Sequence, residues 1–198
     1  MVDNKSTMID SNLNDRIARR VRDLRAARGK SLEALATHCG VSRSMLSLIE
    51  RGESSPTAVV LEKLAAGLGV PLASLFDAPE PAAEPVSRLA DQVSWRDPHS
   101  GYVRRNVSPS GVASPTRIVD VVFPPKARVT YESADRLPLV QQQVWVLEGT
   151  MEVTHGQDTY TLHAGDCLAM ALDQPNGFHN PGSTDARYAV VLTTTSRS

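Results

Sequence analysis

The stretch that decides the fold of the N-terminal half is Ser31-Leu-Glu-Ala-Leu-Ala-Thr-His-Cys-Gly-Val-Ser-Arg-Ser-Met-Leu-Ser-Leu-Ile-Glu-Arg-Gly52. Apolar residues recur at helical spacing on both sides of Gly40, which predicts two short helices joined by a tight turn. Ala36 is small where the two helices would cross, and Val41 and Ile49 would fill the wedge between them. This arrangement leaves the outer face of the second helix free to enter a DNA major groove.

Helical periodicity extends over most of residues 13–76. A helix is predicted over residues 14–28, a fourth helix starts at a Thr57 cap, and a short fifth helix follows Pro71. We therefore expect a compact five-helix domain over residues 13–76, preceded by a flexible tail over residues 1–12. The first 76 residues contain 11 Lys and Arg against 8 Asp and Glu, a mildly basic balance that favours a nucleic-acid partner.

The pattern changes after residue 76. Three prolines between Asp77 and Pro85 predict an extended linker, which we place over residues 77–95. Beyond it the hydrophobic period falls from about 3.6 residues to about 2. Eight short candidate strands follow, with a tight hairpin turn at residues 155–158. Many short strands with turn signals predict a sandwich or barrel. The expected fold class is α+β with two domains, the second an all-β domain over residues 96–198.

Bulk features exclude several classes of protein. The two cysteines, Cys39 and Cys167, have no CxxC neighbour, so we expect free, buried thiols and neither a zinc site nor a redox pair. No apolar run approaches the roughly 18 residues that a membrane span needs. The N-terminus is polar and has no hydrophobic signal region. We expect a cytoplasmic protein without membrane contact.

One segment carries a specific resemblance. Gly40-Val-Ser-Arg-Ser-Met-Leu-Ser-Leu-Ile-Glu-Arg-Gly-Glu-Ser-Ser-Pro-Thr57 resembles the phage-repressor-like (XRE) helix-turn-helix family, and the resemblance covers roughly residues 13–76. It implies a transcription regulator whose partner is a double-stranded DNA operator. The residues that it implies in DNA binding are Ser42, Arg43, Ser44, Ser47, Leu48 and Arg51.

Chemistry supports these roles. Ser42, at the start of the helix, would bond a phosphate, and Arg43 would hold a guanine bidentately. Leu48 would touch a thymine methyl group or pack within the domain, and both interpretations stay open. Arg51 and its neighbour Glu50 would make structural or backbone contacts.

The C-terminal half carries a second resemblance. Val144–Val153, Tyr160–Asp166 and Asn180–Gly182 resemble the cupin family, over roughly residues 100–195. The resemblance implies a double-stranded β-helix, or jelly-roll, barrel. In this family three histidines and one glutamate converge on a metal ion.

The expected metal ligands are missing. Aligned on Gly149, the glutamate position holds Gln142, and aligned on Gly165, one histidine position holds Asn176. The two remaining histidine positions fall among residues 135–138, on Asp135 and Leu137 or on Arg136 and Pro138, depending on the gap. Neutral amides are weak ligands for transition metals. We therefore expect no metal, no cofactor and no catalytic residue.

A cupin interior without a metal is still a pocket. We expect Gln142, Asn176 and Val144 to line an effector site for a small polar metabolite, with Arg136 at its rim. The amides would bond carbonyls or amines, and Arg136 would bind a carboxylate. Trp145 should face the opposite way by strand alternation, toward packing or a dimer interface.

The predicted function is ligand-modulated repression or activation by a homodimer. Two alternatives stay open. The first is a metal-dependent cupin enzyme, an oxygenase or epoxidase, with an appended helix-turn-helix. The second is a DNA-binding protein whose barrel only dimerises. A metal assay tests the first alternative, and the absence of any ligand response would identify the second.

Overall fold

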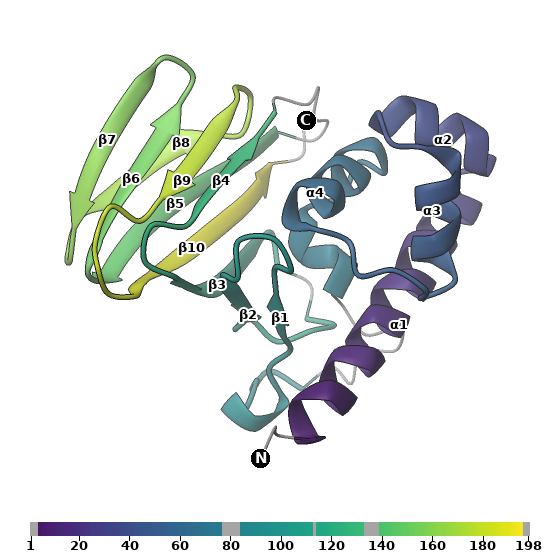
Figure 1. The fold of residues 1–198 in the computed structure, drawn as a ribbon, viewed down its shortest axis with the longest axis horizontal. Helices are drawn as coiled ribbons and strands as arrows, with labels where there is room; N and C mark the ends of the chain where they lie inside the picture. Colours follow the sequence, from purple (N-terminus) through teal and green to yellow (C-terminus); the bar gives the residue numbers. More distant parts are fainter. Residues whose placement is uncertain (1–3, 77–83, 113, 133–138, 196–198) are drawn as a thin grey trace. The chain divides into compact units, whose positions relative to one another are not determined.

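The computed structural model describes residues 4–76, 84–112, 114–132 and 139–195. The chain divides into two compact units, Met1–Pro81 and Ala82–Ser198. The first unit is built of helices and the second of strands (Figure 1). Within the described ranges, no helix is both long enough and apolar enough to cross a membrane.

The helical unit begins with the longest helix of the chain. Its elements are α1 (Asn4–Ala27), α2 (Leu32–Cys39), α3 (Arg43–Glu50), α4 (Ala58–Gly67) and a short 3-10 helix, η1 (Leu72–Phe76). The helices α2, α3 and α4 each follow a Ser or Thr whose side chain accepts a backbone N–H of the first turn, namely Ser31, Ser42 and Thr57. Such side chains satisfy N–H groups that have no partner within the helix.

Gly40 makes the turn between α2 and α3, as predicted. It follows the last residue of α2 with φ 62° and ψ 36°. This left-handed conformation is accessible to glycine without steric cost, whereas a Cβ atom is disfavoured there. The turn that joins the two helices of the motif therefore has a backbone geometry that the sequence specifies.

Two helical expectations need correction. The first helix begins at Asn4, so residues 4–12 continue α1 and do not form a tail; the stretch contains no Gly or Pro that would end a helix. The predicted fifth α-helix is the five-residue 3-10 helix η1, and segments this short favour 3-10 geometry. The bundle within residues 4–76 therefore has four α-helices, not five.

The core of the helical unit gathers side chains from all five elements. The residues that are at most 1% exposed include Ile17, Val21, Leu35, Leu46, Ile49, Leu61, Leu64, Leu68 and Leu75. Met45 on α3, although apolar, is 40% exposed. The inward arc of α3 is taken by Leu46, Ile49 and Glu50, which leaves Met45 on the flank.

The second unit contains two antiparallel sheets (Figure 1). The larger has the order β1-β2-β3-β10-β5-β8, and the smaller has the order β4-β9-β6-β7. Their strands are β1 (Ser94–Arg96), β2 (Val103–Asn106), β3 (Thr116–Phe123), β4 (Arg128–Tyr131), β5 (Leu139–Glu148), β6 (Thr150–His155), β7 (Asp158–His163), β8 (Cys167–Ala171), β9 (Asn176–His179) and β10 (Ala186–Thr195). The predicted hairpin turn joins β6 to β7, where His155 pairs with Asp158.

The expected closed barrel is wrong. Among the described strands, β1 and β8 are edges of the larger sheet, β4 and β7 are edges of the smaller, and no ladder joins the two sheets. The edge strands β1 and β4 have only three and four residues, which leaves few backbone groups to continue a ladder from one sheet to the other. The short strands β1 and β9 were also not predicted, and β1 lies in the stretch that we expected to be linker.

Aromatic side chains fill the space between the sheets. Tyr102 stacks on Phe123 with ring centroids 5.4 Å apart, and Phe178 stacks on Tyr188 at 5.7 Å. Trp95 meets Tyr102 edge-on at 5.8 Å. Since Phe178 belongs to the smaller sheet and Tyr188 to the larger, these contacts hold the two layers together.

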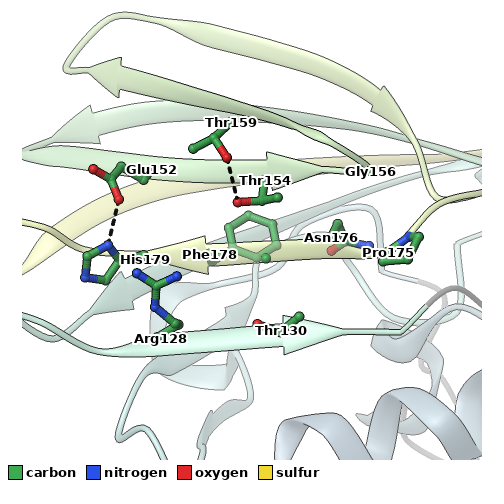
Figure 2. Close-up of a pocket in the computed structure, with 11 residues that line it drawn as sticks. Arg128, Thr130, Glu152, Thr154, Gly156, Thr159, Pro175, Asn176, Phe178 and His179 are labelled. Atoms are coloured by element: carbon green, nitrogen blue, oxygen red, sulfur yellow. Dashed lines mark hydrogen bonds and ion pairs between the residues drawn. The ribbon is translucent and has the colours of Figure 1, made fainter.

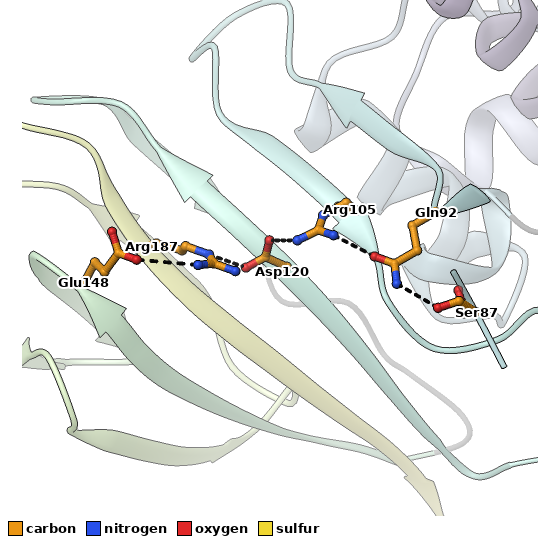
Figure 3. Close-up of polar contacts among 6 residues, drawn as sticks. All are labelled: Ser87, Gln92, Arg105, Asp120, Glu148 and Arg187. Carbon is orange, nitrogen blue, oxygen red and sulfur yellow. Dashed lines mark hydrogen bonds and ion pairs between the residues drawn. The ribbon is translucent and has the colours of Figure 1, made fainter. Parts of the chain in front are cut away.

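A chain of polar contacts crosses the larger sheet (Figure 3). It runs through Ser87, Gln92, Arg105, Asp120, Arg187 and Glu148. Burial opposes ionisation of Asp120, but hydrogen bonds from Arg105 and Arg187 outweigh it and hold the pKa of this carboxyl below its usual value. The network fixes residues 87–92 to strands β2, β3 and β10.

Candidate functional site

The helix α3 is anchored to α1 by a buried ion pair. The guanidinium of Arg25 donates from Nε to Oε1 of Glu50 at 2.6 Å and from Nη2 to Oε2 at 2.8 Å. A third donor, Nη1, binds the backbone oxygen of Lys30 at 2.9 Å. This bidentate geometry fixes both the distance and the rotation of α3. The expectation that Glu50 has a structural role agrees with this contact, whereas Arg25 was not singled out from the other arginines of α1.

The anchored helix leaves a polar face toward solvent. Arg43, Ser44 and Leu48 are exposed, and Ser47 is half-buried. The Arg43 guanidinium lies 3.5 Å from Glu33, with both side chains about two-thirds or more exposed at 67% and 72%. Surface pairs of this kind are weak, so Arg43 remains available to an incoming ligand. Met45 adds an exposed apolar side chain on the same helix.

The Ser42 hydroxyl has a role within the protein. It accepts the backbone N–H of Met45 at 3.1 Å and lies 3.1 Å from the hydroxyl of Ser44. As a cap it fixes the start of α3, and its own proton remains usable for a hydrogen bond. The first turn of α3 therefore presents two hydroxyls and one guanidinium together.

Arg51 is held by neighbours on its own segment. Its Nε and Nη2 each donate to Glu53 at 2.9 Å, and Nη1 donates to the hydroxyl of Ser47. The hydrogen bond to Glu53 raises the pKa of Arg51 and lowers that of Glu53. With its charge balanced by a carboxylate, Arg51 is less suited to base reading than Arg43 and better suited to a contact at the edge of the interface.

In the strand unit, β5 alternates as predicted. Gln142, Val144 and Val146 are buried and face the other sheet, whereas Trp145 is 49% exposed on the opposite side. Gln142 is 7% exposed, and its amide makes no hydrogen bond with any residue that the structure describes. Asn176, on β9, is also buried, and its amide donates only one long bond of 3.4 Å, to the backbone oxygen of Gln174. Two interior amides thus have unused hydrogen-bonding capacity.

The fourth expected effector residue, Arg136, lies outside the described residues. The interior contains another arginine, Arg104 on β2, which sequence reasoning missed. It is buried on the face shared with Tyr102, Tyr131 and Tyr188, and its charge acts on all three hydroxyls.

The three tyrosines are hydrogen-bond donors in the interior. The hydroxyls of Tyr102 and Tyr131 lie 3.1 Å apart. Burial raises the pKa of Tyr102, and it raises those of Tyr131 and Tyr188 well above the ordinary tyrosine value, with Arg104 opposing the rise. These hydroxyls therefore stay protonated. The two-residue spacing between Tyr102, directly before β2, and Arg104, on β2, was the signal that could have revealed this buried face.

The histidines of the strand unit point elsewhere. His179 faces away from the interior and pairs through Nδ1 with Oε2 of Glu152 at 2.8 Å. His155 makes a hydrogen bond of 2.9 Å with the backbone oxygen of Ala171. Across the described ranges, no three His, Cys, Asp or Glu side chains form a group that could hold a metal ion. Cys167 is exposed, contrary to the expectation that both thiols are buried, whereas Cys39 is buried.

Comparison with known proteins gives two family matches. Residues 21–75 match the helix-turn-helix family and residues 139–192 match the cupin domain family. The HTH-type transcriptional regulator SutR of Escherichia coli is 28% identical over 179 residues, which are 87% of this chain and 91% of that protein. The HTH-type transcriptional regulator PuuR of Escherichia coli is 28% identical over 183 residues, which are 89% of this chain and 94% of that protein.

A solved structure has the same architecture. The crystal structure of a helix-turn-helix transcriptional regulator from Vibrio cholerae superposes with a TM-score of 0.75 at 27% identity, covering 95% of this chain and 99% of that chain. The fold and the sequence thus agree on an N-terminal helix-turn-helix domain followed by a cupin domain. Residues 21–75 therefore match a helix-turn-helix domain of the XRE type and residues 139–192 a cupin domain, and the chain as a whole is similar to HTH-type transcriptional regulators.

Proposed function

We propose that this protein binds a specific double-stranded DNA operator through α3 and represses or activates transcription from it. The observation that carries the proposal is the exposed first turn of α3, where Arg43 and Ser44 stand free of the core on a helix fixed by Arg25 and Glu50. The names of the relatives SutR and PuuR support the same function.

Each residue of this face has a proposed role. Arg43 holds a guanine bidentately in the major groove, and Ser44 and Ser47 bond neighbouring base edges or phosphates. Leu48, which is 37% exposed, packs on a thymine methyl group. Ser42 contributes a hydroxyl to a phosphate at the helix N-terminus, and Arg51 contacts the DNA backbone.

The test is operator binding by the full chain. Sequences are first selected from a random duplex library, and the affinity of Arg43→Ala for the best sequence is then measured at fixed salt. The loss of a bidentate base contact should cost about 1–3 kcal/mol and relax specificity at one base pair. The matched control is Arg88→Ala, which removes an exposed arginine from the strand unit. Equal affinity of wild type and Arg43→Ala would remove Arg43 from the reading face.

We further propose that the cupin interior binds a small polar metabolite that changes DNA affinity. Gln142 and Asn176 supply amides with unused hydrogen-bonding capacity, and Val144 supplies an apolar wall. Arg104 with its neighbouring tyrosines joins this proposed site from β2. Gln142→Leu and Asn176→Leu should abolish the effect of an inducing metabolite on operator binding while leaving operator affinity unchanged. Full induction in both variants would contradict this placement.

The proposal includes a homodimer that acts in the cytoplasm, where its operator lies. A single helix-turn-helix neutralises few phosphates and binds weakly at cellular salt, whereas two heads on one operator gain from effective concentration. Trp145 and Ile118, 49% and 41% exposed on the outer face of the larger sheet, support association through that face. Light scattering should give twice the 21.4 kDa chain mass; a single-chain mass at working concentration would refute the dimer.

The two alternatives make different predictions. As an enzyme of the metal-dependent cupin type, the protein would need a ligand set, and Gln142 and Asn176 are poor ligands at two of its four positions. We therefore propose a regulator without catalytic activity, and one tightly bound metal ion per chain would overturn this. A cupin that only dimerises would give operator binding that no metabolite alters.

A further inference from the structure

The outer face of the smaller sheet contains a hollow of about 430 Å³. Its polar side chains lie on the side of the sheet that faces away from the aromatic core. Asn176, at the end of β9, borders it as well as the interior site proposed above, whereas Gln142 and Val144 do not line it. Gly177, within β9, lines the hollow and pairs with Thr130 on β4 and with Thr154 on β6. Figure 2 shows these two threonines on the strands on either side of β9. Arg128 and the Glu152–His179 pair stand along one side (Figure 2).

Gly177 is not explained by the fold. Its φ is outside the left-handed region, so its backbone conformation is open to any residue. A Cβ atom placed on it would lie 3.5 Å from the backbone oxygen of Val129, 3.6 Å from Oγ1 of Thr130 and 3.8 Å from Cβ of Thr154, all ordinary contacts. Glycine inside a strand weakens it and often marks a place where a ligand approaches closely.

Arg128 is the group in the hollow that can receive an anion. Glu152 is already paired with His179, with 2.8 Å between Oε2 and Nδ1. Arg128, which pairs with His179 across the sheet, is exposed, and its guanidinium has no hydrogen bond or ion pair with any described residue. The hydroxyls of Thr154 and Thr159 lie 3.2 Å apart and continue the polar row onto β7. One unpaired cation thus stands next to a group of hydroxyls.

We propose that this hollow binds a small organic acid that carries hydroxyl groups. Arg128 receives the carboxylate in a bidentate pair, and Thr130 and Thr154 exchange hydrogen bonds with the hydroxyls. The absent side chain of Gly177 leaves room for the carbon skeleton between them. The volume lies within the range of small-molecule pockets. The site differs from the interior effector site in its charged group, Arg128, and shares with it only the bordering residue Asn176 among the described residues.

The experiment uses ¹⁵N-labelled full-length protein titrated by NMR with D-gluconate, L-tartrate and citrate, with sorbitol and inorganic phosphate as separate arms. A hydroxy acid should shift the amide resonances of Thr130, Thr154 and Gly177 saturably, and sorbitol, which lacks the carboxylate, should not. An equal response to inorganic phosphate would show that the hollow recognises only an anion and would overturn the assignment to a hydroxy acid.

Two variants and two controls decide the assignment. Arg128→Gln should weaken binding at least about tenfold, as the loss of a charged hydrogen bond implies, and Gly177→Val should do the same by filling the floor. Arg88→Gln and Arg28→Gln, both at exposed positions outside the hollow, should leave binding unchanged. Since Arg128 is exposed, its substitution decides the question even if Gly177→Val lowers stability. Absence of saturable shifts up to about 10 mM acid, or unchanged binding by Arg128→Gln, would overturn the proposal.

Discussion

The ion pair between Arg25 and Glu50 gives the sharpest prediction about the helical unit. The side chains of Arg25 and Glu50 are 17% and 7% exposed, and two of the guanidinium donors meet the carboxylate at 2.6 and 2.8 Å. Arg25→Met keeps most of the aliphatic stem but leaves Glu50 without its cation. The carboxylate then has to be buried unpaired, be protonated, or pull α3 away from α1 to reach water.

The size of the effect follows from burial. Removing one partner of a buried ion pair costs about 3–5 kcal/mol, because the remaining charge keeps its desolvation penalty. Arg25 retains some solvent access, so we expect the lower end, about 3 kcal/mol. That is a large part of the 5–15 kcal/mol typical of a whole domain. The double variant Arg25→Met/Glu50→Met should recover most of the loss, since no charge is then left buried.

The two units can be observed separately. Both tryptophans, Trp95 and Trp145, belong to the strand unit, so fluorescence follows that unit and far-UV circular dichroism at the helix band follows the other. Urea unfolding of Arg25→Met should move the dichroism transition to lower urea and leave the fluorescence transition in place. Arg28→Met, an exposed position at the end of the same helix region, is the control for loss of charge. A loss below about 1 kcal/mol, no larger than the control, would refute the anchoring role.

Three further predictions concern other parts of the chain. Gly40→Ala should destabilise the helical unit by about 1–2 kcal/mol, because the backbone there is left-handed. Gly177→Ala introduces neither strain nor a clash and should not destabilise the strand unit. Urea titrations of the two variants measure the change in unfolding free energy of each unit. Asp120→Asn should lower the stability of the strand unit at neutral pH, and the difference from wild type should shrink below about pH 4. The pKa of Asp120 is lower in the folded state than in the unfolded state, so its carboxylate stabilises the folded unit above the unfolded-state pKa, and this stabilisation is lost as the pH falls through the folded-state pKa. A difference that does not depend on pH would contradict this. Gln142→Leu should raise the unfolding free energy of the ligand-free protein by about 1 kcal/mol, measured by fluorescence, and a loss of stability would show that the amide has a structural role.

Local signals account for what the sequence predicted well. The caps Ser31, Ser42 and Thr57 and the turn at Gly40 depend on residues within one helical turn, so the limits of α2, α3 and α4 could be read directly. The side of the sheet to which each side chain of β5 points followed from strand alternation alone. The family resemblance added the order of the two domains.

Long-range partners could not be predicted in the same way. Several arginines recur on α1 at helical spacing, and nothing near Arg25 indicates that its partner is Glu50. On β2, two arginines stand side by side, and only the pairing with β3 decides that Arg104 faces the core while Arg105 meets Asp120. The prediction of a closed barrel was wrong for a related reason, since strand pairing across the molecule is not a property of any one strand. The hollow at Gly177 was missed because β9 was not recognised as a strand.

The interior of the strand unit also bears on whether the cupin senses a ligand or only dimerises. A module that only dimerises needs its outer face, and its interior can be filled with apolar side chains, as β5 does at Val144 and Val146. At Gln142 the same strand instead places an amide that is mostly buried and has no hydrogen bond to any described residue, which costs part of the free energy of a hydrogen bond. Leucine at that position would avoid the cost. Residues that lower stability in this way are typical of binding sites, and Gln142 therefore favours a regulator whose cupin interior has a ligand to recognise.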